Sequence, residues 1–437
     1  MKPITKRTLL STAVALAAFQ AHGAGFQISE HSASGLGRAF AGEAAIADNA
    51  AVAARNPAAM TMFDSAQVSG GLSFIQPDVD TTVTSSSLAI SNPPAQTGSQ
   101  NYSGVAPDAL VPNAHYVRPL NDKMAIGMSV FSNFGLATEY PTDAIAGPGA
   151  GKSELATVDF NANFAYEVNQ QLSLGVGLNA VYADATLTRN AGSLQPVLAG
   201  AGLTVPSATT EVTSLEGNGW GFGWNVGALW QFNENNRVGF GYRSKVDITL
   251  EGDYKGTSNP ASLVTGASVP GELELNLPDI FEFSGYHKIV PKWAISYSVM
   301  RTGWSSFEEL RATSASCSST DGAGVCLLKE EKWEDSWRYA IGATHYLNEM
   351  WTLRAGFAID ESPVKDEYRT MSIPDTDRNW YTLGATYKAT DSLTIDGGFA
   401  YLNGDTVTGS ESESVATYNF QAGGDAYIYS ISANYTF

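Results

Sequence analysis

Long stretches of this chain place an apolar or aromatic residue at every second position, with mostly polar residues or glycine between them. The clearest stretches are 158–166, 172–182, 220–230, 238–242, 381–387, 393–401 and 427–437. Because successive side chains of a β-strand point to opposite faces, each stretch predicts a strand with one apolar and one polar face. The last stretch runs to Phe437, so we expect the chain to end on an aromatic strand.

The second constraint is the lack of a helix that could cross a membrane. Beyond the N-terminal residues, no run of 18 or more apolar residues is present, so any membrane insertion must use strands. Lipid offers the backbone no hydrogen bonds, and among sheets only a closed one pairs the N–H and C=O groups of every strand. Apolar-out, polar-in segments with aromatic ends are the signature of a transmembrane barrel. We therefore predict an all-β fold, a transmembrane antiparallel β-barrel.

The connections alternate between short and long, which gives the number of strands. Short turns rich in Asn, Asp, Glu and Pro are expected at 120–122, 167–169, 233–235, 290–291, 347–349 and 390–391. Long polar loops are expected at 80–108, 140–156, 190–216, 253–271, 312–328, 362–378 and 404–424. Together they join about 14 strands, with the short turns on the periplasmic side and the long loops outside.

The N-terminal residues have the features of a secretory signal peptide. Three basic residues precede an apolar run at 9–19, and Ala21 and Gly23 supply the small residues of a cleavage site. We expect residues 1–23 to be removed on export to the outer membrane. What remains holds 22 basic against 44 acidic residues, a charge balance that argues against nucleic acid as a partner.

Residues 24–62 do not alternate and are rich in Gly, Ala and Ser. A barrel of about 14 strands has a lumen wider than its own side chains can fill. We therefore predict an N-terminal plug, or hatch, at 24–62 inside a barrel that spans 63–437. The glycines Gly35, Gly37 and Gly42 do not form a nucleotide-binding loop, because no strand precedes them.

The remaining chemistry-bearing residues point to structure rather than catalysis. Cys317 and Cys326 lie in a Ser/Gly-rich segment of an exported chain, which predicts one disulfide in a loop, the alternatives being free thiols or metal ligands. The acidic pairs 308–309, 330–331 and 334–335 are either solvated charges or cation sites. We expect no catalytic residue, no metal and no cofactor, although a nucleophile on the lumen wall would make a barrel enzyme.

Several motifs resemble the plug of the FadL family of outer-membrane long-chain fatty acid transporters, to which the TodX-type aromatic hydrocarbon transporters are related. The plug motifs are Ala24-Gly25-Phe26-Gln27, Ser34-Gly35-Leu36-Gly37-Arg38-Ala39, Gly42-Glu43, Ala47-Asp48 and Arg55-Asn56-Pro57-Ala58. Similar stretches follow in order along the barrel: 111–113, 132–139, 179–183, 220–225, 275–278 and 372–375. The resemblance thus spans the whole mature chain.

The resemblance implies a monomeric barrel that takes up long-chain fatty acids by passive, ligand-gated diffusion through an internal hydrophobic pocket. In the family a basic pair near the pocket binds the carboxylate, and the matching residues are Arg189 and Lys329. Either could instead be a rim charge. Strict alternation back from Trp333 turns Lys329 outward unless a bulge intervenes. Phe26 matches a residue that reaches the pocket and gates it, the alternative being ordinary plug packing.

The resemblance also implies a lateral exit. In the family the motif Asn56-Pro57-Ala58 lies beside an inward kink in the third strand, matched here by Ser132 to Gly135, and the kink opens a gap in the wall. Pro57 restricts Asn56 to extended or turn geometry, so a structural turn is the plainer interpretation. Gly135 suits a sharp bend because it lacks a Cβ.

The expected ligands are long-chain fatty acids or similar hydrophobic small molecules, and the expected surroundings are outer-membrane lipid and lipopolysaccharide. The main alternative is uptake of neutral hydrocarbons, alkanes or monoaromatics, by the same fold, for which Arg189 and Lys329 would bring no gain. A general porin would need an open polar lumen, which a plug at 24–62 opposes. A role of the loops as adhesion or phage receptors is compatible with transport.

Overall fold

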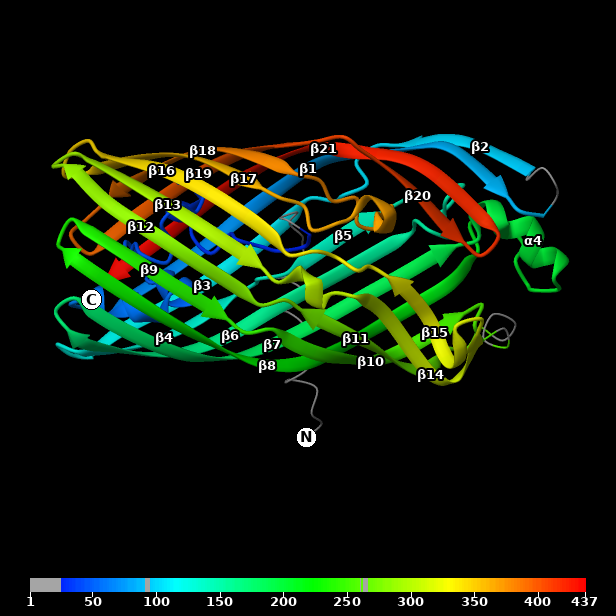
Figure 1. Cartoon of the computed structure of the whole chain (residues 1–437), viewed down its shortest axis with the longest axis horizontal. Helices are drawn as coiled ribbons and strands as arrows, with labels where there is room; N and C mark the ends of the chain where they lie inside the picture. Colours follow the sequence, from blue (N-terminus) through cyan, green and yellow to red (C-terminus); the bar gives the residue numbers. More distant parts are fainter. Residues whose placement is uncertain (1–24, 91–94, 260, 262–265) are drawn as a thin grey trace.

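The computed structural model describes residues 25–90, 95–259, 261 and 266–437, so the expected signal peptide at 1–23 lies outside the described residues. Its strand segments form one antiparallel sheet that closes on itself, because β1 (Gln67–Leu88) pairs with β3 (Ala109–Asn121) on one side and with β21 (Ala416–Thr436) on the other. The wall is a closed barrel of 14 strands, as the sequence predicted (Figure 1).

Seven of the 14 strands consist of two segments each, separated by a short irregular stretch. The split strands are β2–β3 (Ala95–Tyr102, Ala109–Asn121), β4–β5 (Met124–Phe131, Gly135–Glu139), β9–β10 (Asn236–Arg243, Val246–Gly256), β11–β12 (Val269–Leu277, Ile280–Val290), β13–β14 (Trp293–Thr302, Glu309–Ser319), β15–β16 (Gly322–Glu330, Ser336–Tyr346) and β19–β20 (Leu393–Gly404, Val407–Glu413). The continuous ones are β1, β6 (Lys152–Asn169), β7 (Leu172–Asn190), β8 (Glu211–Asn233), β17 (Trp351–Asp360), β18 (Arg378–Lys388) and β21. Pro278, which lacks an N–H, lies in one of the breaks.

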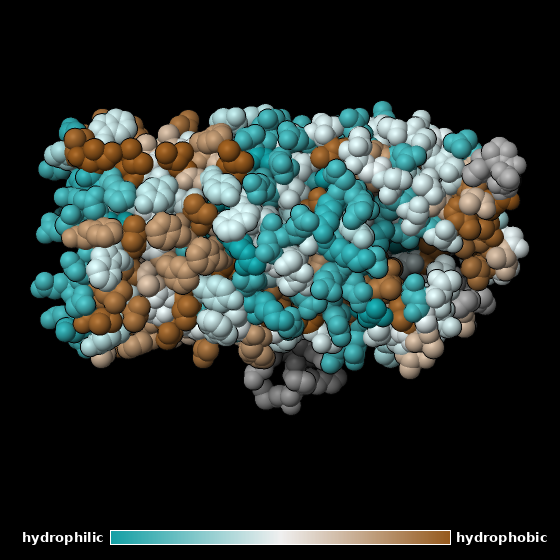
Figure 2. All heavy atoms as spheres, viewed as in Figure 1, coloured by the Kyte–Doolittle hydropathy of each residue, from teal (hydrophilic) through white to brown (hydrophobic). Residues whose placement is uncertain are grey.

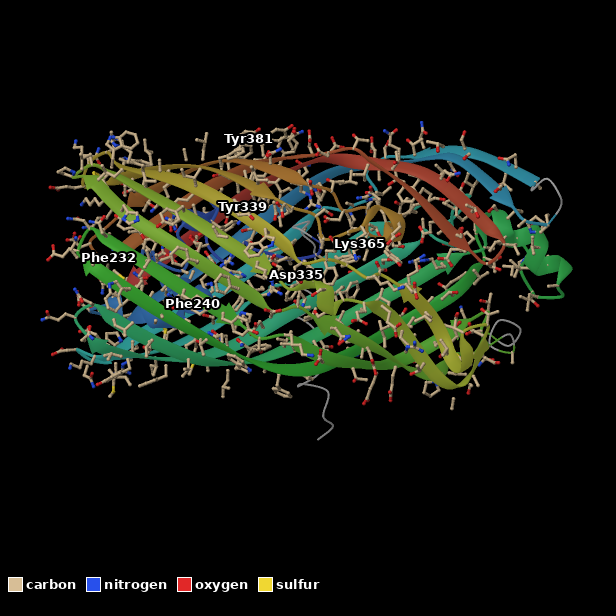
Figure 3. The ribbon with its side chains drawn as sticks, viewed as in Figure 1. Phe232, Phe240, Asp335, Tyr339, Lys365 and Tyr381 are labelled. Atoms are coloured by element: carbon tan, nitrogen blue, oxygen red, sulfur yellow. A yellow bond between two sulfur atoms is a disulfide. The ribbon has the colours of Figure 1, made fainter. Side chains whose placement is uncertain are left out.

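The outer face of one half of the barrel is apolar. Phe222 is 75% exposed and Leu178 is 71% exposed, whereas Asn179 and Asn225 on the opposite face are buried. Figure 2 shows apolar (brown) side chains over much of the half that carries the short turns, and mainly hydrophilic (teal) ones beside them in the middle of the barrel. In Figure 3 the aromatic residues Phe232, Tyr339 and Tyr381 lie nearer the short turns, at the left, than the charged Asp335 and Lys365 do. This apolar band is the membrane-facing surface.

The six predicted short turns join neighbouring strands, but three of the predicted loops, 80–108, 312–328 and 404–424, are largely strand, and strands run into both ends of a fourth, 253–271. Within 80–108, 253–271, 312–328 and 404–424, the hairpin β1–β2, the ends of β10 and β11, the hairpin β14–β15 and the hairpin β20–β21 extend the wall. These extensions lie beyond the apolar band, at the right of Figure 1. Outside the membrane a strand needs no apolar face, so the alternation that marks the other strands is absent there.

Residues 25–63 lie within the barrel, with few exposed side chains. The helix α2 (Ala33–Leu36) contacts β18, β19 and β21, whereas the 3-10 helix η1 (Pro57–Met62) contacts β6, β7 and β8; α3 (Val52–Arg55) lies between them in the chain. Among the described residues, no helix is both long and apolar enough to cross a membrane.

The polar inner face of the wall holds this irregular segment through its backbone. Arg338, Arg237 and Arg243 donate to the carbonyls of Ala39, Ala45 and Ala54, at 3.1, 2.6 and 2.8 Å. Buried carbonyls outside helices and sheets need such donors. Glycines in the wall allow the close approach: at Gly239 and Gly356 a Cβ would overlap the backbone of residues 44 and 38.

Candidate functional site

A cavity of about 880 Å³ lies in the half of the barrel beyond the apolar band. This volume is within the range of about 300–1,000 Å³ typical of small-molecule pockets. One part of its wall is apolar and is formed by Phe26, Leu136, Leu155, Leu215, Leu250, Leu273, Leu275 and Phe307. The other part carries charged side chains, so the cavity has an apolar body and a charged end.

Phe26 forms the centre of an aromatic cluster beside the apolar wall. Its ring is 4.5 Å from Trp304, 5.4 Å from Phe307 and 5.6 Å from Trp333, measured between centroids, and it is 1% exposed. Edge-to-face aromatic contacts of this kind stabilise by about 0.5–1.5 kcal/mol each beyond area burial. Phe26 thus lines the cavity and also packs the N-terminal segment against the wall, while its role as a gate stays a prediction.

Lys329 reaches the charged end of the cavity from β15. Its ammonium donates to Glu411 Oε1 at 2.6 Å and to Glu413 Oε1 at 2.7 Å. Burial opposes the charge, but these two carboxylates hold the pKa of Lys329 above its usual value. Trp333 does not face outward as strict alternation assumed: it is 3% exposed and packs against Phe26, so Lys329, Glu331 and Trp333 all lie on the inner side. The alternation restarts after Trp333, in the break between β15 and β16.

Arg189 reaches the same end from the C-terminal, loop-side end of β7. Its guanidinium donates to the carbonyls of Lys152 and Thr188, at 3.1 and 2.8 Å, and to the hydroxyls of Ser153 and Ser372, at 3.2 and 2.8 Å. The planar guanidinium is therefore fixed by neutral groups. No carboxylate is among these four partners, and the acidic groups that act on its charge at longer range are Glu411, Glu413 and Glu331.

Glu331 is a site residue that the sequence interpretation missed. It was expected to be solvated or to bind a cation, but it is only 2% exposed and accepts a hydrogen bond from the Trp333 indole at 3.0 Å. Burial raises the pKa of Glu331 to about 8, against the opposing charge of Lys329. Its neighbour Glu330 is exposed and pairs with Lys332, as a solvated charge does.

A segment between β17 and β18 ties the charged end to the N-terminal residues. Met371 N donates to Glu411 Oε2 at 3.0 Å, Ser372 accepts from Arg189, and Asp375 Oδ2 accepts from Gly25 N at 3.0 Å. The family-like stretch 372–375 had no assigned role in the sequence. One short segment thus contacts three residues: Arg189, Glu411, which is a partner of Lys329, and Gly25 at the start of the N-terminal segment.

The motif Asn56-Pro57-Ala58 forms a helix start. Asn56 is extended, with φ −139°, and its side chain accepts from Ala58 N, which caps η1. Its amide nitrogen donates to the carbonyls of Ala44 and Ala228, at 2.6 and 3.0 Å. The motif contacts β7 and β8, where Gly175 and Gly227 make room for it. The residues at the third-strand kink are instead 26–31.

The third strand is interrupted between β4 and β5, and the wall is broken beside it. β4 pairs with β3 as far as Val130 and Ala114, whereas β5 pairs with β6 alone among the described strands. The N-terminal segment fills this break: Gly135 N donates to Phe26 O at 2.9 Å, and Ile28 N donates to Asn133 O at 2.7 Å.

Ser132 and Gly135 flank the break in different ways. Ser132 donates to the carbonyl of Thr157 and accepts, through its backbone, from His31. A Cβ at Gly135 would lie 2.9 Å from Ile28 Cδ1. The nearby outward residues Phe74 and Val130 are 38% and 40% exposed, so the break lies at the level of the apolar band.

Cys317 and Cys326 form the expected disulfide, within the hairpin β14–β15. Both are buried, and Cys326 lines the cavity. The bond therefore stabilises the hairpin that carries Lys329. Across the residues that the structure describes, no three His, Cys, Asp or Glu side chains converge to hold a metal ion.

These features define the class of the protein: an outer-membrane β-barrel with residues 25–63 packed inside it and a cavity that has an apolar body and a charged end. Residues 14–437 match the family model described as outer membrane protein transport protein (OMPP1/FadL/TodX). The chain belongs to this family of transport proteins and is located in the outer membrane.

Relatives in other bacteria match along the whole chain. The long-chain fatty acid transport protein of Escherichia coli O6:H1 is 42% identical over 458 residues, which cover 100% of this chain and 99% of the relative. Outer membrane protein P1 of Haemophilus influenzae is 42% identical over 463 residues, with 99% of each covered. The crystal structure of a Pseudomonas aeruginosa FadL homologue superposes with a TM-score of 0.82 at 21% identity, covering 95% of this chain and 100% of that one.

Proposed function

We propose that the protein takes up long-chain fatty acids across the outer membrane by passive, ligand-gated diffusion, with residues 24–62 as the plug. The observation that carries the proposal is the cavity, which joins a long apolar wall to an end with two cationic side chains, Arg189 and Lys329. The names of the full-length relatives, long-chain fatty acid transport proteins, support the same substrate class.

The apolar wall accounts for the affinity. An acyl chain gains about 0.8 kcal/mol per buried methylene, so about 15 methylenes supply roughly 12 kcal/mol before ordering costs. The carboxylate is the harder group to accommodate, because burying it unpaired would cost several kcal/mol. We assign this role to Arg189 and Lys329, because charge-assisted hydrogen bonds offset that cost.

The alternative is a neutral hydrocarbon, as in the Pseudomonas putida toluene transporter TodX, whose structure superposes with a TM-score of 0.63 at 17% identity over 96% of this chain and 99% of that one. That likeness concerns the fold alone. A neutral ligand would gain nothing from the buried guanidinium and ammonium groups, whereas a carboxylate would. The charged end of the cavity therefore favours the fatty acid.

For release we propose a lateral route through the break beside β4 and β5. A fatty acid that leaves there enters the bilayer directly and keeps its acyl chain out of water. The break is occupied by residues 26–28, so opening requires this segment to move away from Gly135. Because Phe26 also lines the cavity, a ligand that pushes on its ring would loosen the same segment.

The substrate class is tested by replacing both cations. We expect Arg189→Ala with Lys329→Ala to weaken oleate binding by at least about tenfold, because a charge-assisted hydrogen bond contributes about 1.5–3 kcal/mol. Binding of oleyl alcohol, which has the same chain and no charge, should change little. The measurement is a titration of the purified barrel with each ligand.

Lys332→Ala is the matched control, because Lys332 is an exposed lysine of the same segment that pairs with Glu330. Equal oleate affinity of the double variant and the wild type would favour the neutral hydrocarbon. The mass of the lipid that copurifies with the protein offers an independent measure of the substrate class.

A further inference from the structure

The salt bridges of Lys329 differ in how firmly each glutamate is held. Glu411 is 3% exposed, and its second oxygen accepts from Met371 N at 3.0 Å. The Glu413 side chain is 31% exposed, and within the described residues its carboxylate bonds to Lys329 alone. Glu411 is thus a fixed partner of the ammonium, whereas Glu413 can leave it for solvent.

Glu413 also lies next to a hairpin tip, which a backbone bond, from Ala89 N to Val415 O at 2.8 Å, ties to the end of β1. It is the last residue of β20, and the turn to β21 contains Ser414, which has φ +57°. Glu413, Ser414 and Val415 all line the cavity, so the tip of this hairpin forms part of its charged end. A two-residue hairpin tip beyond the apolar band has fewer packing contacts to break than a residue within the wall.

The charges around Lys329 leave little place for a further anion. Two cations, Arg189 and Lys329, face three carboxylates, those of Glu331, Glu411 and Glu413. Burial raises the pKa of both Glu331 and Glu413, which reflects how poorly this end of the cavity tolerates negative charge. A fatty acid carboxylate would be a fourth acid group beside the same two cations.

We infer that Glu413 is a built-in competitor for Lys329: a fatty acid carboxylate binds by displacing the Glu413 carboxylate from the ammonium, while Glu411 stays in place. The inference rests on the proposed function and specifies how the headgroup site discriminates among carboxylate ligands. Glu413 then sets the affinity for carboxylate ligands without affecting the binding of the acyl chain. The displaced hairpin tip would carry its charge into solvent.

The test is the isosteric substitution Glu413→Gln. The amide is a weaker acceptor for the ammonium than the carboxylate, so we expect oleate to bind about tenfold more tightly than to the wild type. Oleyl alcohol should bind equally to both proteins, because it does not compete for Lys329. In a Lys329→Ala background the same substitution should leave the oleate affinity unchanged.

Glu330→Gln is the matched control, since it removes an equal charge from a neighbouring exposed residue that does not contact Lys329. Oleate binding that is unchanged or weaker in Glu413→Gln would overturn the competitor role while leaving fatty acid uptake intact. Tighter binding of oleate and oleyl alcohol alike would also overturn it, because the hairpin would then act by steric hindrance. A wild-type protein that binds oleyl alcohol but not oleate would instead overturn the substrate class.

Discussion

Glu331 shows how a single buried carboxyl group can make the cavity sensitive to pH. Its nearest charged neighbours are Lys329, Glu411 and Arg189, and the Trp333 indole donates to it. Because its pKa is raised to about 8, the group is uncharged below that pH and negative above it. The charged end of the cavity therefore becomes more negative as the pH rises past this value.

We predict that oleate binding weakens by roughly three- to tenfold between about pH 7 and about pH 9, because an ionised Glu331 repels the ligand carboxylate at short range. Glu331→Gln should remove this dependence. The comparison of the two proteins at each pH cancels the titration of oleate itself. A wild-type profile that parallels that of Glu331→Gln would contradict the assignment.

At this scale the sequence predicted part of the site. Arg189 lies on the polar phase of a regular strand, and its inward direction follows from alternation alone. The direction of Lys329 and the burial of Glu331 depend on the break between β15 and β16, before which Trp333 lies inside the barrel against Phe26 and not on the lipid-facing side. Glu411 and Glu413 come from a hairpin more than 80 residues away in the chain, a distance over which one sequence gives no pairing information.

The segment 26–28 is the element that closes the wall beside the third strand. Its backbone bonds to Asn133 and Gly135, as an added strand would, and the proposed release requires these two bonds to break. Gly135→Trp is a poor way to block the exit, because its side chain would strike Ile28 and disturb the segment itself. A covalent lock on the segment is the sharper experiment.

We predict that Gln27→Cys with Phe134→Cys forms a disulfide that stops uptake but preserves binding. These residues face each other across the isolated antiparallel bridge, and the hydrogen bonds on either side are made by their neighbours. In such a non-hydrogen-bonded pair the Cα atoms are about 4.5 Å apart, which is within the range that a disulfide spans. Uptake of labelled oleate by cells should return after mild reduction. Undiminished uptake by the oxidised variant would rule out release that depends on this segment.

Two controls accompany the lock. Gln27→Cys alone should transport oleate as the wild type does, and the wild type should be treated with the same reductant, since Cys317 and Cys326 form a native disulfide. The native bond is buried and should resist mild conditions.

At the element scale the membrane part of the fold was predictable and the outer part was not. Alternation and turn residues gave the 14 strands and the six short turns, because lipid imposes an apolar face on every spanning strand. Beyond the band, water imposes no such pattern, and strand pairing in the hairpins β14–β15 and β20–β21 was mistaken for loop. Both hairpins contribute to the charged end of the cavity.

At the scale of the whole molecule, the barrel holds residues 25–63 inside its wall. Arginines of the wall bond to the backbone of the inner segment, and Arg38 within that segment pairs with Glu43 and Asp48, each at 2.7 Å. Removing such a segment would expose a wide lumen lined by polar side chains.

We predict that the wild-type protein gives no stable ohmic steps in a planar bilayer, whereas deletion of residues 25–62 produces a large, steady conductance. Ions need a continuous water path, and the inner segment interrupts it. Heat-dependent mobility on gels would verify that the deletion variant is folded. Porin-like conductance of the wild type would contradict a plugged barrel.

The seam between β1 and β21 has a consequence for biogenesis. The two strands pair along nearly their full length, from Gln67 with Thr436 to Leu88 with Ala416, although more than 300 residues separate the partners. Closing so large a loop is entropically slow, and it requires the last strand of the chain to have been delivered. Until then both strands present free edges, which invite aggregation. Assembly of this barrel is therefore expected to end in a single late closing step, and the chain needs protection of its edges until that moment.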